Sequence, residues 1–264
     1  VRATLDVSDG IAQAENVFTW ADHTLADEQY VVKVDPNIPH DITSIIGCAV
    51  MTGAGAVINT ARVQPGQSVA VFGVGGVGLS AIVGAKVAGA YPIIAVDLDD
   101  AKLEFAKRFG ATHGINAAKE EPVAAIHAMT QSKDAYTILQ TPVSGVDFAF
   151  DCIGIRKTME QIVPACRSGH FGARDGGTAV LVGVPSTNVE LNAMDVLLQE
   201  KHFIGSIGGS CAPDRDFPTF IDWQQSGRLR LEELVTQRFS IEEINEATAA
   251  LESGKISGRA ILEF

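Results

Sequence analysis

The sequence predicts an α/β protein organised around a doubly wound parallel sheet. Short apolar runs with strand character alternate with helical patterns from about residue 68 to residue 207, which is typical of parallel strands connected by helices. About six strands fall within that interval, the number expected of one such domain. With 264 residues, 46% of them hydrophobic, the chain is long enough to bury a substantial core in one large or two unequal domains.

The clearest pattern lies between residues 67 and 97. Val69–Phe72 predicts a buried strand, and Leu79–Ala90 carries apolar residues at helical spacing. Ile93–Val96 predicts a second strand, which ends on Asp97. Between the first strand and the helix lie four glycines, Gly73, Gly75, Gly76 and Gly78. This order of strand, glycine turn, helix, second strand and acidic residue predicts a dinucleotide-binding (Rossmann) unit.

The chemistry of a dinucleotide explains these residue types. Gly73 lets the chain turn out of the strand, Gly75 lets the backbone approach a pyrophosphate, and Gly78 lets the helix pack on the sheet. The helix start presents free N–H groups and a positive dipole end to phosphate. Asp97 accepts hydrogen bonds from an adenosine ribose and repels a 2′-phosphate, so we expect NAD rather than NADP. A glycine turn that binds nothing is the alternative.

Upstream of this unit the signal is weaker. Phe18–Val34 has a β-like alternation. Asp41 is expected to cap a helix, and a second helix is expected from about Cys48 or Thr52 to about Arg62.

Downstream, the alternation continues and then changes. Helices are predicted over 99–109, closed by Gly110, and over 122–129 and 158–165, with strands over 112–116, 146–152 and 178–184. Residues 132–144 are polar and are expected to form an extended surface loop. Beyond about residue 208 we expect a helix ending near Gly227, a strand within 231–239, a helix over 241–253 and a final strand over 259–264. The apolar stripe of the last helix is Ile244, Ala247 and Leu251.

Charge and cysteine usage exclude several functions. The formal net charge is −12 and no run of Lys or Arg occurs, so nucleic acid and anionic membranes are poor partners. The sequence contains no uninterrupted apolar stretch of about 18 residues, so no membrane span is expected. The four cysteines, Cys48, Cys152, Cys166 and Cys211, form no CxxC pair. This argues against a zinc ribbon or redox dithiol and indicates reduced thiols in the cytoplasm.

Several motifs together resemble one family. The segments are IIGCAVMTGAG at 45–55, PGQSVAVFGVGGVGLSAI, IIAVDLDDAKLEFAKRFGAT, GVDFAFDCIG, LVGVP, GSIGGS and the terminal FSIEEINEATAALESGKISGRAILEF. In this order they resemble the zinc-dependent medium-chain alcohol dehydrogenases, from about Phe18 to Phe264. The resemblance implies hydride transfer between NAD and a small alcohol or aldehyde. It also implies a homodimer or homotetramer associated through the nucleotide domain.

The resemblance also implies a division of the chain. Residues 1–50 would be a remnant of a β-rich, GroES-like catalytic domain, 51–207 the NAD-binding domain, and 208–264 a return to the catalytic domain. The chain begins at Val1 without an initiator Met. We therefore expect it to correspond to the C-terminal two-thirds of such an enzyme, with the N-terminal part of the catalytic domain absent.

Two positions carry the family's catalytic chemistry. Cys48 matches the third ligand of the catalytic zinc, which would act as a Lewis acid on the substrate oxygen. Thr52 matches a residue lying against the nicotinamide. The family's two earlier ligands, a Cys and a His, have no counterpart here, since His23 and His40 stand in other contexts. A catalytic zinc needs three protein ligands, so the site is expected to be incomplete.

The remaining matches concern the cofactor. The segment 73–78, including Gly76 and Val77, matches the pyrophosphate turn. Asp97 matches the ribose acid, and Lys102 a lysine that contacts the ribose.

Three later segments complete the cofactor site of the family. Cys152 and Ile153 match the adenosine side of the cleft. The backbone of Val182 and Val184 matches the positions that hold the nicotinamide carboxamide. Arg259 matches an arginine that reaches the pyrophosphate.

Other interpretations stay open. Cys48 is also compatible with an ordinary buried thiol, Lys102 with an exposed helix lysine and Arg259 with a surface arginine. The other three cysteines are expected to be inert. At the level of function, the alternatives are an NAD(H)-binding module without activity of its own and an enzyme that uses another adenosine ligand, such as S-adenosylmethionine.

Overall fold

The computed structural model describes residues 3–7, 10–14, 26, 28, 31–170 and 175–264. The expected β-like segment Phe18–Val34 lies largely outside the described residues. Its described end, residues 31–34, forms no strand, so that part of the prediction is wrong.

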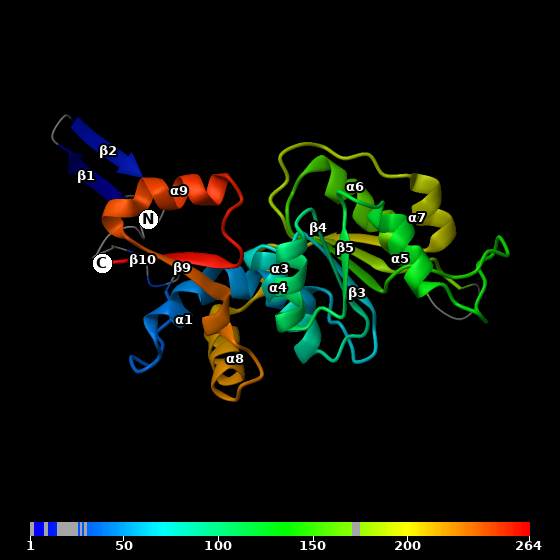
Figure 1. Ribbon diagram of the computed structural model, residues 1–264, viewed down its shortest axis with the longest axis horizontal. Helices are drawn as coiled ribbons and strands as arrows, with labels where there is room; N and C mark the ends of the chain where they lie inside the picture. Colours follow the sequence, from blue (N-terminus) through cyan, green and yellow to red (C-terminus); the bar gives the residue numbers. More distant parts are fainter. Residues whose placement is uncertain (1–2, 8–9, 15–25, 27, 29–30, 171–174) are drawn as a thin grey trace.

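A six-stranded parallel sheet forms the centre of the molecule (Figure 1). Its strands are β3 (Val69–Phe72), β4 (Ile93–Asp97), β5 (His113–Asn116), β6 (Phe148–Asp151), β7 (Thr178–Leu181) and β8 (His202–Gly205). Their order across the sheet is β5-β4-β3-β6-β7-β8, and every neighbouring pair is parallel. The chain therefore runs outward from β3 first in one direction and then in the other, which confirms the predicted doubly wound sheet.

Alternate residues of the central strands β3, β4, β6 and β7 enter two different cores. Val69 and Val71 of β3 pack into one core, whereas Ala70 and Phe72 pack into the other. The first core is covered by α3 (Gly76–Val87) and α4 (Asp100–Phe109), and the second by α5 (Pro122–Thr130), α6 (Arg156–Ala165) and α7 (Ala193–Gln199). Burial of both faces explains why the strands are continuous apolar runs rather than alternating ones.

One helical run, His40–Thr60, packs against the first core. It consists of α1 (His40–Ile45), the π-helical η2 (Ile46–Val50), α2 (Met51–Gly55) and the π-helical η3 (Ala56–Thr60). The expected break between two helices is wrong, and Asp41 lies in the first turn of α1 after an N-cap at Pro39. The run is long and apolar enough to cross a membrane by length and composition, but 56% of its apolar window is buried inside the protein. It is a core helix of this fold.

The C-terminal segments lie toward the end of the molecule where α1 lies (Figure 1). They are η4 (Gly208–Ser210), α8 (Pro213–Gln225), η5 (Leu231–Leu234), β9 (Val235–Ser240), η6 (Ile241–Glu243), α9 (Ile244–Glu252) and β10 (Arg259–Glu263). β9 and β10 form a separate parallel pair. An antiparallel pair of strands that the sequence did not reveal, β1 (Ala3–Val7) and β2 (Gly10–Ala14), lies at the same end.

Candidate dinucleotide site

The glycine turn, residues 73–78, leaves the carboxyl end of β3 through a sharp bend. Gly73 has a φ of +86°, a conformation that side-chain-bearing residues rarely adopt. A Cβ on Gly78 would lie 1.8 Å from the Gly73 carbonyl oxygen, so only glycine lets α3 start this close to the strand. By contrast, a Cβ on Gly75 would meet no atom within 4 Å. Gly75 is exposed, and it is the place where a ligand can touch the turn.

The start of α3 offers uncommitted donors. Gly75 is the N-cap and provides no side-chain capping bond. The first helical bond to this cap is from the Leu79 N–H to the Gly75 carbonyl, at 2.8 Å. The N–H groups of the three preceding helical residues have no partner within the helix. Such a helix start attracts anions.

Arg259 lies directly over this helix start. A Cβ on Gly76 would be only 2.2 Å from the Cδ atom of Arg259, so the absence of a side chain at Gly76 gives the arginine its place. The Nε atom of Arg259 is buried and has no hydrogen-bond partner among the residues that the structure describes. A buried donor without a partner is costly. A phosphate at the helix start would satisfy it with a charge-assisted bond.

The carboxylate of Asp97 lies beside the turn at the end of β4. It accepts hydrogen bonds from the backbone N–H groups of Val74 (2.9 Å), Leu98 (2.8 Å) and Asp99 (3.2 Å). A carboxylate offers about four acceptor positions, so these three bonds fix its orientation and leave capacity for a hydroxyl. Lys102, in the first turn of α4, is half-buried and forms no ion pair with any described residue.

The neighbouring acid has a different role. Asp100 accepts a hydrogen bond from the Asn116 side chain at 2.7 Å and pairs with Lys119. These bonds, the Asn116 one first, lower the pKa of Asp100. Asp100 therefore braces α4 against the end of β5, whereas Asp97 faces the glycine turn.

The loop after β6 closes the other side of the turn. Ile153 is 43% exposed, and a Cβ on Gly73 would lie 2.3 Å from its Cγ1 atom. The fully buried Asp151 orients this loop by accepting the Gly154 N–H at 2.9 Å. Burial raises the pKa of Asp151. Burial also raises the pKa of the Cys152 thiol.

The loop after β7 contacts the loop after β6 through backbone atoms. Val182 is buried and donates its N–H to the Asp151 carbonyl at 3.0 Å. Val184 is 82% exposed, and its carbonyl oxygen lies 2.1 Å from where a Cβ on Gly154 would stand. Gly154 and Gly183 allow this close approach. Both glycines belong to motifs of the sequence, Gly154 to GVDFAFDCIG and Gly183 to LVGVP, but neither had a predicted role, although a glycine soon after a strand is the usual signal for such an approach.

Thr52 and Cys48 approach the site from the helical run 40–60. A Cβ on Gly53 would lie 2.1 Å from the Val77 carbonyl, so α2 packs directly on the first turn of α3 and brings the half-buried Thr52 close to it. Cys48 lies in the π-helical segment η2 and is exposed. The interpretation of Cys48 as an ordinary buried thiol is therefore wrong.

The described residues do not complete a zinc site. No group of three or more His, Cys, Asp or Glu side chains in the described part of the chain could hold a metal ion. Cys48 is thus a single candidate donor, and three protein ligands are required. The donor set of the described residues therefore does not fit a catalytic zinc.

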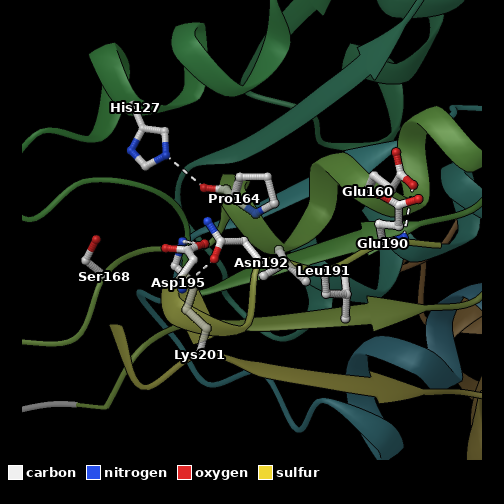
Figure 2. A pocket seen from close by; sticks show the side chains of 10 residues that line it. His127, Glu160, Pro164, Ser168, Glu190, Leu191, Asn192, Asp195 and Lys201 are labelled. Carbon is white, nitrogen blue, oxygen red and sulfur yellow. Dashed lines mark hydrogen bonds and ion pairs between the residues drawn. The ribbon is translucent and has the colours of Figure 1, made fainter. Parts of the chain in front are cut away.

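A separate hollow of about 480 Å³ lies between α5, α6 and the start of α7 (Figure 2). Its polar groups are engaged with one another. His127 lies 2.8 Å from the Pro164 carbonyl and 2.6 Å from the Ser144 hydroxyl, and Lys201 pairs with Asp195 at 3.1 Å. Because these groups are already satisfied, the hollow offers less to a ligand than the glycine turn, where the Nε atom of Arg259 has no partner among the described residues.

Comparisons with known proteins agree with this geometry. A sequence profile described as zinc-binding dehydrogenase matches residues 76–226. The chain is 36% identical to alcohol dehydrogenase class-3 of Cereibacter sphaeroides over 93% of its length and 63% of that protein. It is 35% identical to S-(hydroxymethyl)glutathione dehydrogenase of Saccharomyces cerevisiae over 89% of its length and 58% of that protein.

Solved structures resemble the fold over the same extent. Benzyl alcohol dehydrogenase from Acinetobacter calcoaceticus superposes with a TM-score of 0.79 at 34% identity, covering 91% of this chain and 61% of that one. A zinc-binding-domain alcohol dehydrogenase from Burkholderia ambifaria gives a TM-score of 0.80 at 33% identity, covering 91% of this chain and 60% of that one. The chain spans about three fifths of the length of the curated relatives it matches.

Proposed function

The chain belongs to the family of zinc-dependent medium-chain alcohol dehydrogenases, and from this premise we propose that it binds NAD(H) at the carboxyl edge of its parallel sheet. The observation that carries the proposal is the buried Nε atom of Arg259, which lies over Gly76 at the positive start of α3 and has no partner in the described part of the chain. Together with the free N–H groups of the glycine turn, this arginine would hold the pyrophosphate. An adenosine ligand without a pyrophosphate, such as S-adenosylmethionine, would leave Arg259 unsatisfied.

The other contacts follow the edge of the sheet in both directions. The adenosine ribose hydroxyls would donate hydrogen bonds to the carboxylate of Asp97, with Lys102 beside it as a donor, and Cys152 and Ile153 would line the adenosine side. The carboxylate of Asp97 disfavours a 2′-phosphate, so the proposed cofactor is NAD. On the other side, Val182, Val184 and the segment 206–208 would hold the nicotinamide half near Thr52. When bound, NAD supplies a hydride acceptor.

The proposed reaction is the oxidation of a small alcohol, or the reverse reduction of an aldehyde, because relatives that the chain matches are named alcohol dehydrogenases. We propose residues 1–50 and 208–264 as parts of a catalytic domain and 51–207 as the nucleotide domain. The first of these boundaries falls inside the continuous helical run 40–60. Cys48 would be one donor to a zinc whose other ligands lie outside the described residues.

We also propose a homodimer or homotetramer built on the nucleotide domain. β8 is an edge strand, and no other described strand pairs with its outer side. Close to it lie large exposed apolar side chains, including Val184 (82% exposed), Leu197 (69%) and Ile207 (92%). An exposed apolar group beside an unpaired edge suits association with a second copy. The four free cysteines support a cytoplasmic location.

A second candidate function is an NAD(H)-binding module without catalytic activity of its own. It is favoured by one observation, the shortage of metal donors around Cys48 among the described residues. Both candidate functions include NAD(H) binding, but only the dehydrogenase requires a bound zinc ion.

One paired measurement tests both candidates. NADH is titrated into the purified chain by fluorescence, and bound zinc is counted on the same sample, followed by an assay with primary alcohols. Saturable NADH binding with one zinc per chain and alcohol oxidation would support the dehydrogenase. Saturable NADH binding without stoichiometric zinc would support the binding module. Absence of NADH binding would overturn the cofactor assignment.

A further inference from the structure

The segment between β8 and α8 contains a left-handed turn. Gly208, Gly209 and Ser210 have φ angles of 54°, 66° and 50°, so three successive residues lie in the left-handed region. Glycine adopts this region freely, but Ser210 does so at a conformational cost. Contacts from other elements must hold this turn, residues 206–210, in place.

The helical run 40–60 supplies the first set of contacts. A Cβ on Gly209 would lie 1.9 Å from the Met51 carbonyl oxygen, so the turn packs on the helix backbone itself. At the end of the run, the Thr60 hydroxyl lies 2.7 Å from the hydroxyls of both Ser206 and Ser210. The two ends of the turn are therefore fastened to one side chain.

A buried carboxylate supplies the second set. Asp216, in the first turn of α8, is 7% exposed. Its Oδ2 atom accepts hydrogen bonds from the Asn59 side-chain amide at 3.1 Å and from the Ala212 N–H at 2.8 Å. The same Asn59 nitrogen lies 3.5 Å from the Gly209 carbonyl and 3.5 Å from the Cys211 sulfur. Asn59 thus joins the helix, the turn and the carboxylate.

The held turn presents its apex to solvent. Ser206 is buried at 7% exposure and continues the sheet by donating its N–H to the Leu181 carbonyl at 2.9 Å. The next residue, Ile207, is 92% exposed. This apex lies at the carboxyl edge of the sheet, on the side where the nicotinamide half of the cofactor is placed under the proposed function.

We propose that Asp216 and Asn59 are positioning residues that preorganise the turn 206–210 for the nicotinamide half of NAD(H). Neither side chain needs to touch the cofactor. A backbone segment that is already ordered before binding does not have to be ordered by the ligand, so less binding free energy is lost to conformational entropy. The inference rests on the proposed function, because it requires NAD(H) at this edge of the sheet.

The test compares NADH with ADP-ribose, which lacks the nicotinamide, by calorimetric titration of the full chain. In Asp216→Asn and Asn59→Ala, NADH affinity is expected to fall about tenfold, while ADP-ribose affinity stays within about twofold, since only the nicotinamide contacts are lost. Asp214→Asn is the matched control. It makes the same change of charge at an exposed position in the same turn of α8 and should leave both affinities unchanged.

Retained ADP-ribose binding shows that a variant is folded. If Asp216→Asn does not fold, Asn59→Ala alone tests the positioning role. Unchanged NADH affinity, or equal losses for both ligands in Asn59→Ala, would overturn the positioning role while leaving the proposed function intact. A wild-type chain that binds neither ligand would overturn the proposed function and this inference together.

Discussion

The difference between Gly75 and Gly78 leads to a sharp prediction. Both glycines belong to the same turn, but a Cβ on Gly75 meets nothing within 4 Å, whereas a Cβ on Gly78 meets the Gly73 carbonyl oxygen at 1.8 Å. Gly75→Ala is therefore expected to change ligand binding without changing stability. Gly78→Ala is expected to change stability.

The magnitudes can be worked from this geometry. For Gly75→Ala, φ is −75°, which alanine adopts without strain. Loss of a favourable N-cap residue costs about 0.5 kcal/mol, and the reduced entropy of the unfolded chain returns about the same amount. The methyl group, however, occupies the open space through which a phosphate reaches the free N–H groups. Loss of one hydrogen bond to a charged group, about 1.5–3 kcal/mol, lowers NADH affinity by about tenfold to hundredfold.

The assay measures thermal unfolding and NADH titration for both variants. Gly75→Ala should unfold within about 1 °C of the wild type and bind NADH at least about tenfold more weakly. In Gly78→Ala the added methyl group forces the backbone of α3 away from the Gly73 carbonyl, which costs about 1–3 kcal/mol of overpacking energy. This variant should therefore unfold several degrees lower than the wild type. Normal NADH affinity in Gly75→Ala would refute the placement of the pyrophosphate at this turn.

Three further predictions concern charged groups. Arg259→Met should weaken NADH and ADP-ribose binding alike, by about tenfold or more, and should reduce the salt dependence of both titrations; a loss confined to NADH would contradict its pyrophosphate role. Asp97→Ala should reduce the preference for NADH over NADPH, because it removes the charge that opposes a 2′-phosphate, and an unchanged ratio of the two affinities would argue against ribose contact. Hydrogen bonds from Arg215 lower the pKa of Asp216. The ionised Asp216 therefore stabilises the fold fully above the unfolded pKa of about 3.9. This stabilisation is lost as the pH falls through the lower pKa of the folded state. Urea unfolding between pH 3 and 6 should therefore show a smaller loss of stability toward acid in Asp216→Asn than in the wild type, and parallel curves would contradict this.

The sheet could be predicted from the sequence because its signals are local. The apolar runs at Val69–Phe72 and Ile93–Asp97 coincide with β3 and β4. Gly110, with a φ of +126°, ends α4 as expected. In each case an apolar run bounded by glycine or acid specifies both the element and its end.

Other features depend on contacts that the sequence does not display. The π-helical segments η2 and η3 arise where the helical run 40–60 fits against α3 and the turn 206–210, and their residues carry no distinctive local pattern. α7 was not expected, although Asn192 caps it by accepting the Met194 and Asp195 N–H groups. The apolar stripe of α9 predicted a helix correctly, yet none of its residues is buried, and Leu251 is 64% exposed. Periodicity indicates which side of a helix can be buried, but not whether another element covers it.

The glycine turn shows most directly how local sequence and distant contacts combine. Gly73 accommodates Ile153, Gly76 accommodates Arg259, and Gly78 accommodates the backbone of the turn itself. The space beside three of its four glycines is therefore filled by the protein itself, and among the four Gly75 alone faces open space. Two of these neighbours come from the loop after β6 and from β10, so a pattern that looks local in the sequence is completed by residues far along the chain. The chain brings Arg259 to the helix start in the same way, where its Nε atom finds no partner among the residues described and an anion would be its natural partner.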